Sequence, residues 1–247
     1  MRDSLSIACP SMGGHELAVT SWQDMMTKPW PVRVYDERDG DSAGFLTKCD
    51  LLWRETDATI IGYLHSDLYI HEYGWDDRVL EAFVDERVAV VGFVGATGLA
   101  HEDIYKVPYD YRQLARYDVW SNLTDWEVHG ARETGSRQVA VIDSCAVFVR
   151  HSLLGRLHGW PVDRYPNTSH CSDLWICCSA VRHQLVCRMV GVACTHSSGG
   201  RGEAGSHWLD QRGGDQSLHR QAHERLYEDF RDVLPVRVGQ TPLYTAK

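Results

Sequence analysis

Short apolar runs alternate with helical patterns over the first 94 residues, and this alternation limits the chain to a small set of folds. Apolar runs of strand length occupy residues 5–9, 32–35, 59–64 and 88–94. Between them apolar residues recur every three to four positions, which predicts helices from Gly14 onward, over 43–53 and over 76–85. This order of strand and helix predicts an α/β fold, with a mostly parallel central sheet flanked by helices.

Local signals refine this prediction. Pro10 is expected to end the first strand because proline has no N–H to donate. The first helix follows Gly13-Gly14, and its expected buried stripe comprises Leu17, Ala18, Ser21, Trp22, Met25 and Met26. Downstream, strands are expected at 139–143, 145–149 and 186–194, and a helix at 172–182 with Ser172 as its N-cap. Residues 217–230 are expected to form a helical tail.

Composition excludes several classes of protein. The net charge of −9 argues against a general nucleic-acid coat, because such binding depends on neutralising phosphates. No segment approaches the ~20 apolar residues of a membrane helix, and residues 1–4 do not open a secretory signal. We therefore expect a cytoplasmic protein whose eight cysteines are reduced. Zinc binding by the cysteines between Cys171 and Cys194 is the alternative, but no C-x₂-C pair is present.

Two segments depart from the alternating pattern. Residues 95–137 are rich in aromatic side chains: Tyr105, Tyr109, Tyr111, Tyr117, Trp120 and Trp126. These rings either pack in the core or form a platform on which a sugar or a base stacks. Residues 199–214 hold six glycines, which predicts a mobile loop that folds over a bound ligand.

Polar residues follow three of the predicted strands. They are Ser11 after Pro10, Asp36, and the run His65-Ser66-Asp67. In open α/β sheets ligands bind beyond the carboxyl ends of the strands, so these residues are expected to share one rim. His65 and Asp67 alternate on an extended segment and point the same way, which suits a divalent cation bridging a diphosphate. No glycine-rich dinucleotide or P-loop motif follows any strand.

In this order the segments resemble the nucleotide-sugar glycosyltransferases of the GT-A (Rossmann-like) fold, above all the family 2 group. Those proteins have a strand, a helix, a strand ending in an acid, a helix, and a strand ending in D-x-D. Further along, they have a hairpin ending in Arg, a glycine-aromatic turn, an acid at a helix start, and a late strand ending in His. The corresponding residues here are Arg150, His158-Gly159-Trp160, Asp173 and His196, and the resemblance covers roughly residues 5–200.

The resemblance implies a single catalytic domain over residues 1–247, with a small second sheet. Residues 1–94 would bind the nucleotide sugar, 95–200 the acceptor, and 201–247 would form the loop and the C-terminal helix. It also implies a metal-dependent transfer of a sugar from a nucleoside diphosphate sugar, UDP-sugar being favoured, to an acceptor hydroxyl with inversion. The acceptor is left open between a glycan and a hydroxylated DNA base, and the runner-up functions are a nucleotidyltransferase and a non-catalytic binding module.

The implied roles can be assigned residue by residue. Asp67 and His196 would hold Mn²⁺ or Mg²⁺ with His65, and Asp173 would be the general base. The residues expected to bind the nucleotide sugar are Pro10, Ser11, Asp36, His65, Ser66, Asp143 and Trp175. Asp143 is also the next candidate for the base.

Two departures from the family keep alternatives open. His65 stands where the first acid of D-x-D is expected, so it either ligates a transition metal or contacts ribose or phosphate. Only one acid precedes the late helix, and Asp173 is alternatively a helix-end acid favoured by the helix dipole. Asp36 could serve only its turn, and His196 could make only a structural hydrogen bond.

Overall fold

We describe a computed structural model of the 247-residue chain. It describes residues 4–11, 14–36, 44–99, 116–122, 131–165, 171–197 and 217–239. The predicted glycine-rich loop at 199–214, together with Tyr105, Tyr109, Tyr111 and Trp126, lies outside these residues, and the side chains of Tyr117 and Trp120 do too.

A seven-stranded sheet forms the centre of the molecule, in the strand order β2-β1-β3-β10-β5-β11-β8. Pairing is parallel between β2 and β1, β1 and β3, and β5 and β11, whereas β10 and β8 run antiparallel to their neighbours. The strands are β1 (Leu5–Ser11), β2 (Val32–Asp36), β3 (Ile60–Leu64), β5 (Val88–Gly92), β8 (Ser136–Val139), β10 (Ala146–Arg150) and β11 (Val186–Val190). The prediction of a mostly parallel α/β sheet is thus confirmed.

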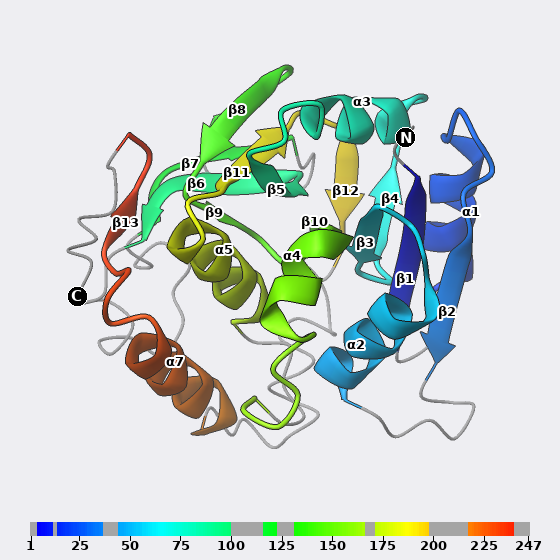
Figure 1. The fold of residues 1–247 in the computed structure, drawn as a ribbon. Helices are drawn as coiled ribbons and strands as arrows, with labels where there is room; N and C mark the ends of the chain where they lie inside the picture. The colour runs from blue at the N-terminus through cyan, green and yellow to red at the C-terminus, as the bar shows by residue number, and fades with distance from the viewer. Residues whose placement is uncertain are drawn as a thin grey trace.

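Helices cover both faces of this sheet (Figure 1). One face packs on α1 (Glu16–Asp24) and α3 (Trp75–Ala82), through buried side chains such as Trp22 and Trp75. The other packs on α2 (Phe45–Glu55), α4 (His151–Leu157) and α5 (Ser172–Arg182). The C-terminal helix α7 (Ser217–Asp229) joins this second face through Ala222 and Leu226, so the helical tail is confirmed. Burial of both faces explains why β3 and β5 are uninterrupted apolar runs.

Two smaller sheets flank the central one within the described residues. The first is a two-stranded ribbon of β4 (Leu68–Ile70) and β12 (Cys194–His196). The second joins β6 (Val94–Leu99) to β7 (Arg116–Ser121), β9 (Val141–Ile142) and β13 (Val236–Arg237). The structure therefore divides the predicted strand at 88–94 into β5 and β6, and the predicted strand at 186–194 into β11 and β12.

The expectation that Pro10 ends the first strand is wrong, because β1 continues to Ser11. Ile7 donates its N–H to Pro31 on the β2 side, so the alternation of the strand puts the nitrogen of Pro10 on the β3 side. There the pairing has already ended at Ala8 and Tyr63. The missing N–H of proline consequently costs no ladder hydrogen bond.

Two further local predictions are corrected. The buried stripe of α1 is narrower than expected, since Ala18, Trp22 and Met26 are buried but Leu17 is 73% exposed. The N-cap of α5 is Cys171 rather than Ser172. Cys171 has a φ of 64°, so the chain enters the helix through a left-handed residue, and Ser172 already lies in the first turn.

A buried carboxylate fixes α3 against the loop that follows α1. Asp76, which is fully buried, accepts hydrogen bonds from the backbone N–H and the hydroxyl of Thr27 at 2.9 and 2.8 Å. It also accepts one from the Trp30 indole at 2.9 Å. These three donors explain how an ionisable group is tolerated in this core.

All eight cysteines are buried and free, as predicted. Among the described helices, none is both long and apolar enough to cross a membrane.

Candidate metal centre

Three side chains from two distant parts of the chain meet beyond the carboxyl end of β3. His65 and Asp67 lie in the turn between β3 and β4, and His196 ends β12. The ribbon of β4 and β12 brings them together, because His196 is paired with Leu68 and the backbone N–H of Ser197 donates to the Asp67 carbonyl at 3.0 Å. The turn is fixed on its other side by the His65 N–H, which donates to the Cys145 carbonyl at 3.1 Å.

The ligand atoms of these residues all lie within 4.8 Å of one another. His196 Nε2 lies 3.2 Å from His65 Nδ1 and 3.1 Å from Asp67 Oδ1. Two ligands that each lie about 2.2 Å from one ion at a right angle are about 3.1 Å apart, so both separations fit adjacent positions on one divalent ion. Without an ion, the same atoms can share a proton between the imidazoles and the carboxylate.

The donor set of two imidazoles and one carboxylate suits a transition metal. Imidazole nitrogen binds Mn²⁺, Fe²⁺ or Zn²⁺, whereas Mg²⁺ and Ca²⁺ prefer a set made of oxygens alone. The His65 ring is supported by the edge of Phe45, at a centroid distance of 6.1 Å. Three protein ligands leave positions for ligand oxygens or water.

Polar residues at the ends of β1 and β2 form a second cluster. Ser11 and Asp36 are neighbours in the parallel register of these strands, and both are buried. Between them lies His15, the N-cap residue of α1. Its Nδ1 is 3.0 Å from Ser11 Oγ and 3.5 Å from Asp36 Oδ2. Pro10 precedes Ser11 in the same strand, so the predicted rim residues Pro10, Ser11 and Asp36 are adjacent.

Cys9 lies close to both acids of the rim. Burial raises the pKa of its thiol to about 12, and the charges of Asp67 and then Asp36 contribute to the rise. Burial likewise raises the pKa of Cys145, with Asp143, Cys194 and Asp67 among the contributing neighbours. Both thiols therefore stay neutral behind the rim and are poor metal ligands.

Asp143 and Ser66 occupy the turns beside this centre. Asp143 is buried, and its Oδ1 accepts the Cys145 N–H at 3.1 Å, which shapes the turn whose Cys145 carbonyl holds His65. Ser66 lies half-buried between His65 and Asp67. The structure thus brings Asp143 to the back of the rim, as a residue that orders a turn.

Asp173 lies in a small pocket next to the metal centre. The pocket is lined by Phe45, Tyr63, Ser144, Val147, Trp160, Ser172 and Asp173. Phe45, which supports His65, connects the two sites. Asp173 is buried at the start of α5, and its Oδ1 accepts the Leu174 N–H at 2.8 Å. The hydrogen bond to the Leu174 N–H is typical of an acid that only caps a helix. The pocket beside Asp173 is the kind of space that a general base would need.

Two hydrogen bonds hold Trp160 in this pocket, one to Asp50 of α2 and one to Tyr63 of β3. Asp50, which is buried, accepts the Trp160 backbone N–H at 2.9 Å, and the Trp160 indole donates to the Tyr63 hydroxyl at 3.0 Å. Gly159 has a φ of 101°, and a Cβ there would lie 2.3 Å from Asp50 Oδ1. Only glycine fits this close approach.

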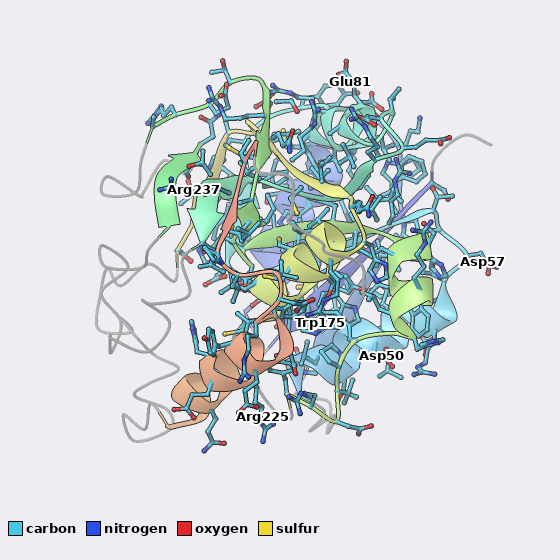
Figure 2. All side chains as sticks on the ribbon, turned by 60° about the vertical axis from the view of Figure 1, so that its left-hand side comes forward. Asp50, Asp57, Glu81, Trp175, Arg225 and Arg237 are labelled. Carbon is cyan, nitrogen blue, oxygen red and sulfur yellow. The ribbon has the colours of Figure 1, made fainter. Side chains whose placement is uncertain are left out.

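Trp175 lies behind the pocket rather than in it. It is buried and packs on Trp160, with ring centroids 5.7 Å apart. Figure 2 labels Trp175 on α5 and Asp50 on α2. Trp175 thus supports the ring of Trp160, and its contact with the nucleotide sugar stays a prediction.

Sequence reasoning missed His15 and Asp50. The i, i+4 spacing of Ser11 and His15 is a weak signal, because only the entry of the chain into α1 turns the imidazole back onto β1. Asp50 gave no signal at all, since it occupies an ordinary position in a helical pattern. Arg150 ends the antiparallel strand β10, and it donates to the carbonyls of Val88, Phe83 and Asp85.

The fold and the rim define the class of protein: an α/β protein with a GT-A-like architecture. No family model and no curated protein matches the sequence. The mannosyltransferase PcManGT from Pyrobaculum calidifontis, solved in complex with GDP-Man and Mn²⁺, is a structural neighbour. The similarity covers 92% of this chain and 70% of that one, with a TM-score of 0.50 and 11% identity.

A second similar structure is A197 from STIV. It matches 77% of this chain and 83% of its own length, with a TM-score of 0.45 and 15% identity. An identity of 11% to the mannosyltransferase shows a shared fold alone. That similarity supports a glycosyltransferase-like fold and does not extend to family 2 in particular.

Proposed function

We propose that this protein is a metal-dependent glycosyltransferase that moves a sugar from a nucleoside diphosphate sugar to an acceptor hydroxyl. The observation that carries the proposal is the convergence of His65, Asp67 and His196, within 4.8 Å, at the carboxyl-end rim of a GT-A-like sheet. A neighbour of the same fold was solved with GDP-Man and Mn²⁺. A diphosphate leaving group needs positive charge at such a place.

The order of the strands supports separate binding places for the nucleoside and the diphosphate along the rim. β2, β1 and β3 are adjacent, so Asp36 and His65 end strands that are two spacings, or about 10 Å, apart. That distance suits a nucleoside at Asp36 and Ser11 with its diphosphate at the metal centre. A metal ion there would neutralise charge on the departing diphosphate, and His65, Asp67 and His196 would hold it.

Asp173 is the proposed general base. A carboxylate in a pocket beside the donor can take the proton of an acceptor hydroxyl as that hydroxyl attacks, and one such displacement inverts the anomeric centre. Trp160, fixed by Asp50 and Tyr63, offers an aromatic wall beside the base. Flat apolar sugar faces and nucleobases both pack on such rings, so this wall suits a glycan acceptor or a flipped DNA base.

The donor set also favours one cofactor. We propose Mn²⁺ rather than Mg²⁺, because two of the three protein ligands are imidazoles. UDP-sugars and GDP-sugars are both candidate donors, the latter because of the GDP-Man bound by the structural neighbour.

A screen of sugar nucleotides for Mn²⁺-dependent release of nucleoside diphosphate tests this function. Wild type should release UDP or GDP from one donor, and Asp67→Ala should abolish the release by removing the carboxylate ligand. The matched control is Asp57→Ala, an exposed acid at the opposite end of β3, which should keep wild-type turnover (Figure 2). Full Mn²⁺-dependent turnover by Asp67→Ala would contradict the metal assignment.

The same screen separates the other functions. Release of pyrophosphate from a nucleoside triphosphate and a sugar phosphate would indicate a nucleotidyltransferase. Binding of nucleoside diphosphates without any turnover would indicate a non-catalytic module.

A further inference from the structure

The proposed function places the nucleoside at Ser11 and Asp36, but it gives no task to His15, which contacts both of them at the ends of β1 and β2. The His15 side chain is 15% exposed and that of Asp36 is 6% exposed, so both lie largely out of contact with solvent. The three residues come from a strand, a helix start and a neighbouring strand. Their geometry gives His15 a defined task.

This cluster is not a hydrolytic triad, although its residue types match one. In such a triad the serine and the carboxylate contact opposite nitrogens of the imidazole. Here Ser11 Oγ and Asp36 Oδ2 both lie at Nδ1, at 3.0 and 3.5 Å. The imidazole therefore cannot relay a proton from the serine to the acid, and nucleophilic catalysis is excluded as its task.

The shared nitrogen instead makes His15 an orienting group. A carboxylate only accepts hydrogen bonds, so Nδ1 can hold Asp36 only in a form that carries a proton there. In that form the N–H would face the Ser11 hydroxyl at 3.0 Å and the Asp36 carboxylate at 3.5 Å, and would restrain both at one end of the rim.

We propose that His15 is a positioning residue for the nucleoside end of the donor. It orients Asp36 and Ser11 toward the ribose or base, while the diphosphate is held at the metal centre about two strand spacings away. The inference rests on the proposed function and adds a residue that no motif of the chain indicated. The role is separable from metal binding, because His15 is not among the three residues of the metal centre.

Two amide variants distinguish the position of the side-chain N–H from the size of the side chain at residue 15. In His15→Asn the side-chain N–H₂ lies near the place of Nδ1, whereas in His15→Gln it lies near that of Nε2. We expect His15→Ala and His15→Gln to weaken binding of UDP or GDP about tenfold, and His15→Asn to restore it to within about threefold. Ten-fold is about 1.4 kcal/mol.

The experiment is titration calorimetry of all four proteins with UDP, GDP and pyrophosphate, each in the presence of Mn²⁺. Pyrophosphate binding should be the same in every variant, and turnover should show a raised KM with an unchanged kcat. Far-UV circular dichroism confirms that each variant is folded.

Equal nucleotide affinity in wild type and His15→Ala would overturn this inference and leave the proposed function standing. Loss of pyrophosphate binding in a folded His15→Ala protein would also overturn it, because the residue would then act on the metal centre. A wild type that binds neither nucleotide would overturn the proposed function, and this inference with it.

Discussion

Replacing Asp76 by alanine should destabilise the protein by about 3 kcal/mol. The carboxylate accepts hydrogen bonds from three donors in a fully buried place. Of these, the Thr27 hydroxyl can rotate to another acceptor, but the Thr27 N–H and the Trp30 indole N–H cannot. Each buried donor left without an acceptor costs about 1–3 kcal/mol, so two cost about 2–6 kcal/mol in total.

The measurement is urea unfolding followed by fluorescence and far-UV circular dichroism, with linear extrapolation. Asp77→Ala is the matched control, since Asp77 is exposed in the same first turn of α3 and shares the same helix-dipole effect. The free energy of unfolding of this control should stay within about 0.5 kcal/mol of that of wild type. Asp76→Asn keeps one acceptor oxygen and should fall between the two. A loss below about 1 kcal/mol in Asp76→Ala, with an unchanged m-value, would refute this reasoning.

Three further outcomes are expected. Asp173→Asn should keep donor affinity and melting temperature but slow transfer about 10²–10⁴-fold, as loss of a general base does; a rate within about threefold of wild type would make Asp173 a helix-end acid only. Gly159→Ala should lower the free energy of unfolding in urea by about 1–3 kcal/mol, because the new Cβ would enter the space of Asp50 Oδ1 at a φ of 101°. Gly155→Ala is the control, since the space around Gly155 is open. Burial holds the pKa of Cys9 at about 12 and all eight cysteines are buried, so native protein at pH 8 should react with a thiol reagent only after unfolding; rapid labelling would show an open core.

The central sheet was predictable because its signal is local. Continuous apolar runs such as β3 occur only where both faces of a strand are covered, and the polar residue that ends such a run must lie at the rim. For this reason the placement of Asp36 and Asp67 at one rim, beyond the strands on either side of β1, followed from the sequence. The meeting of Asp67 with His196 was available only through the resemblance to a known family.

The remaining features depend on contacts that leave no periodic pattern. β4 and β12 have three residues each, too few for an alternation to be read, so the ribbon that joins the metal ligands was not predicted. The exposure of the Leu17 side chain depends on the orientation of α1 against the sheet, which the spacing of apolar residues in the helix does not determine. The packing of Trp175 against Trp160 joins α5 to a distant turn, so its place in a motif did not reveal it.

The β4–β12 ribbon links the candidate metal centre to completion of the fold. His65 and His196 are 131 positions apart, so the centre cannot assemble until nearly the whole described sheet has formed and β12 has docked. During synthesis, a chain that has emerged only as far as β11 has all seven strands of the central sheet but lacks a ligand. An ion bound by all three residues would stabilise only the finished arrangement, by an amount that grows with its concentration over its dissociation constant. The metal would then close a loop of 131 positions, and its removal should loosen β12 before it loosens the sheet.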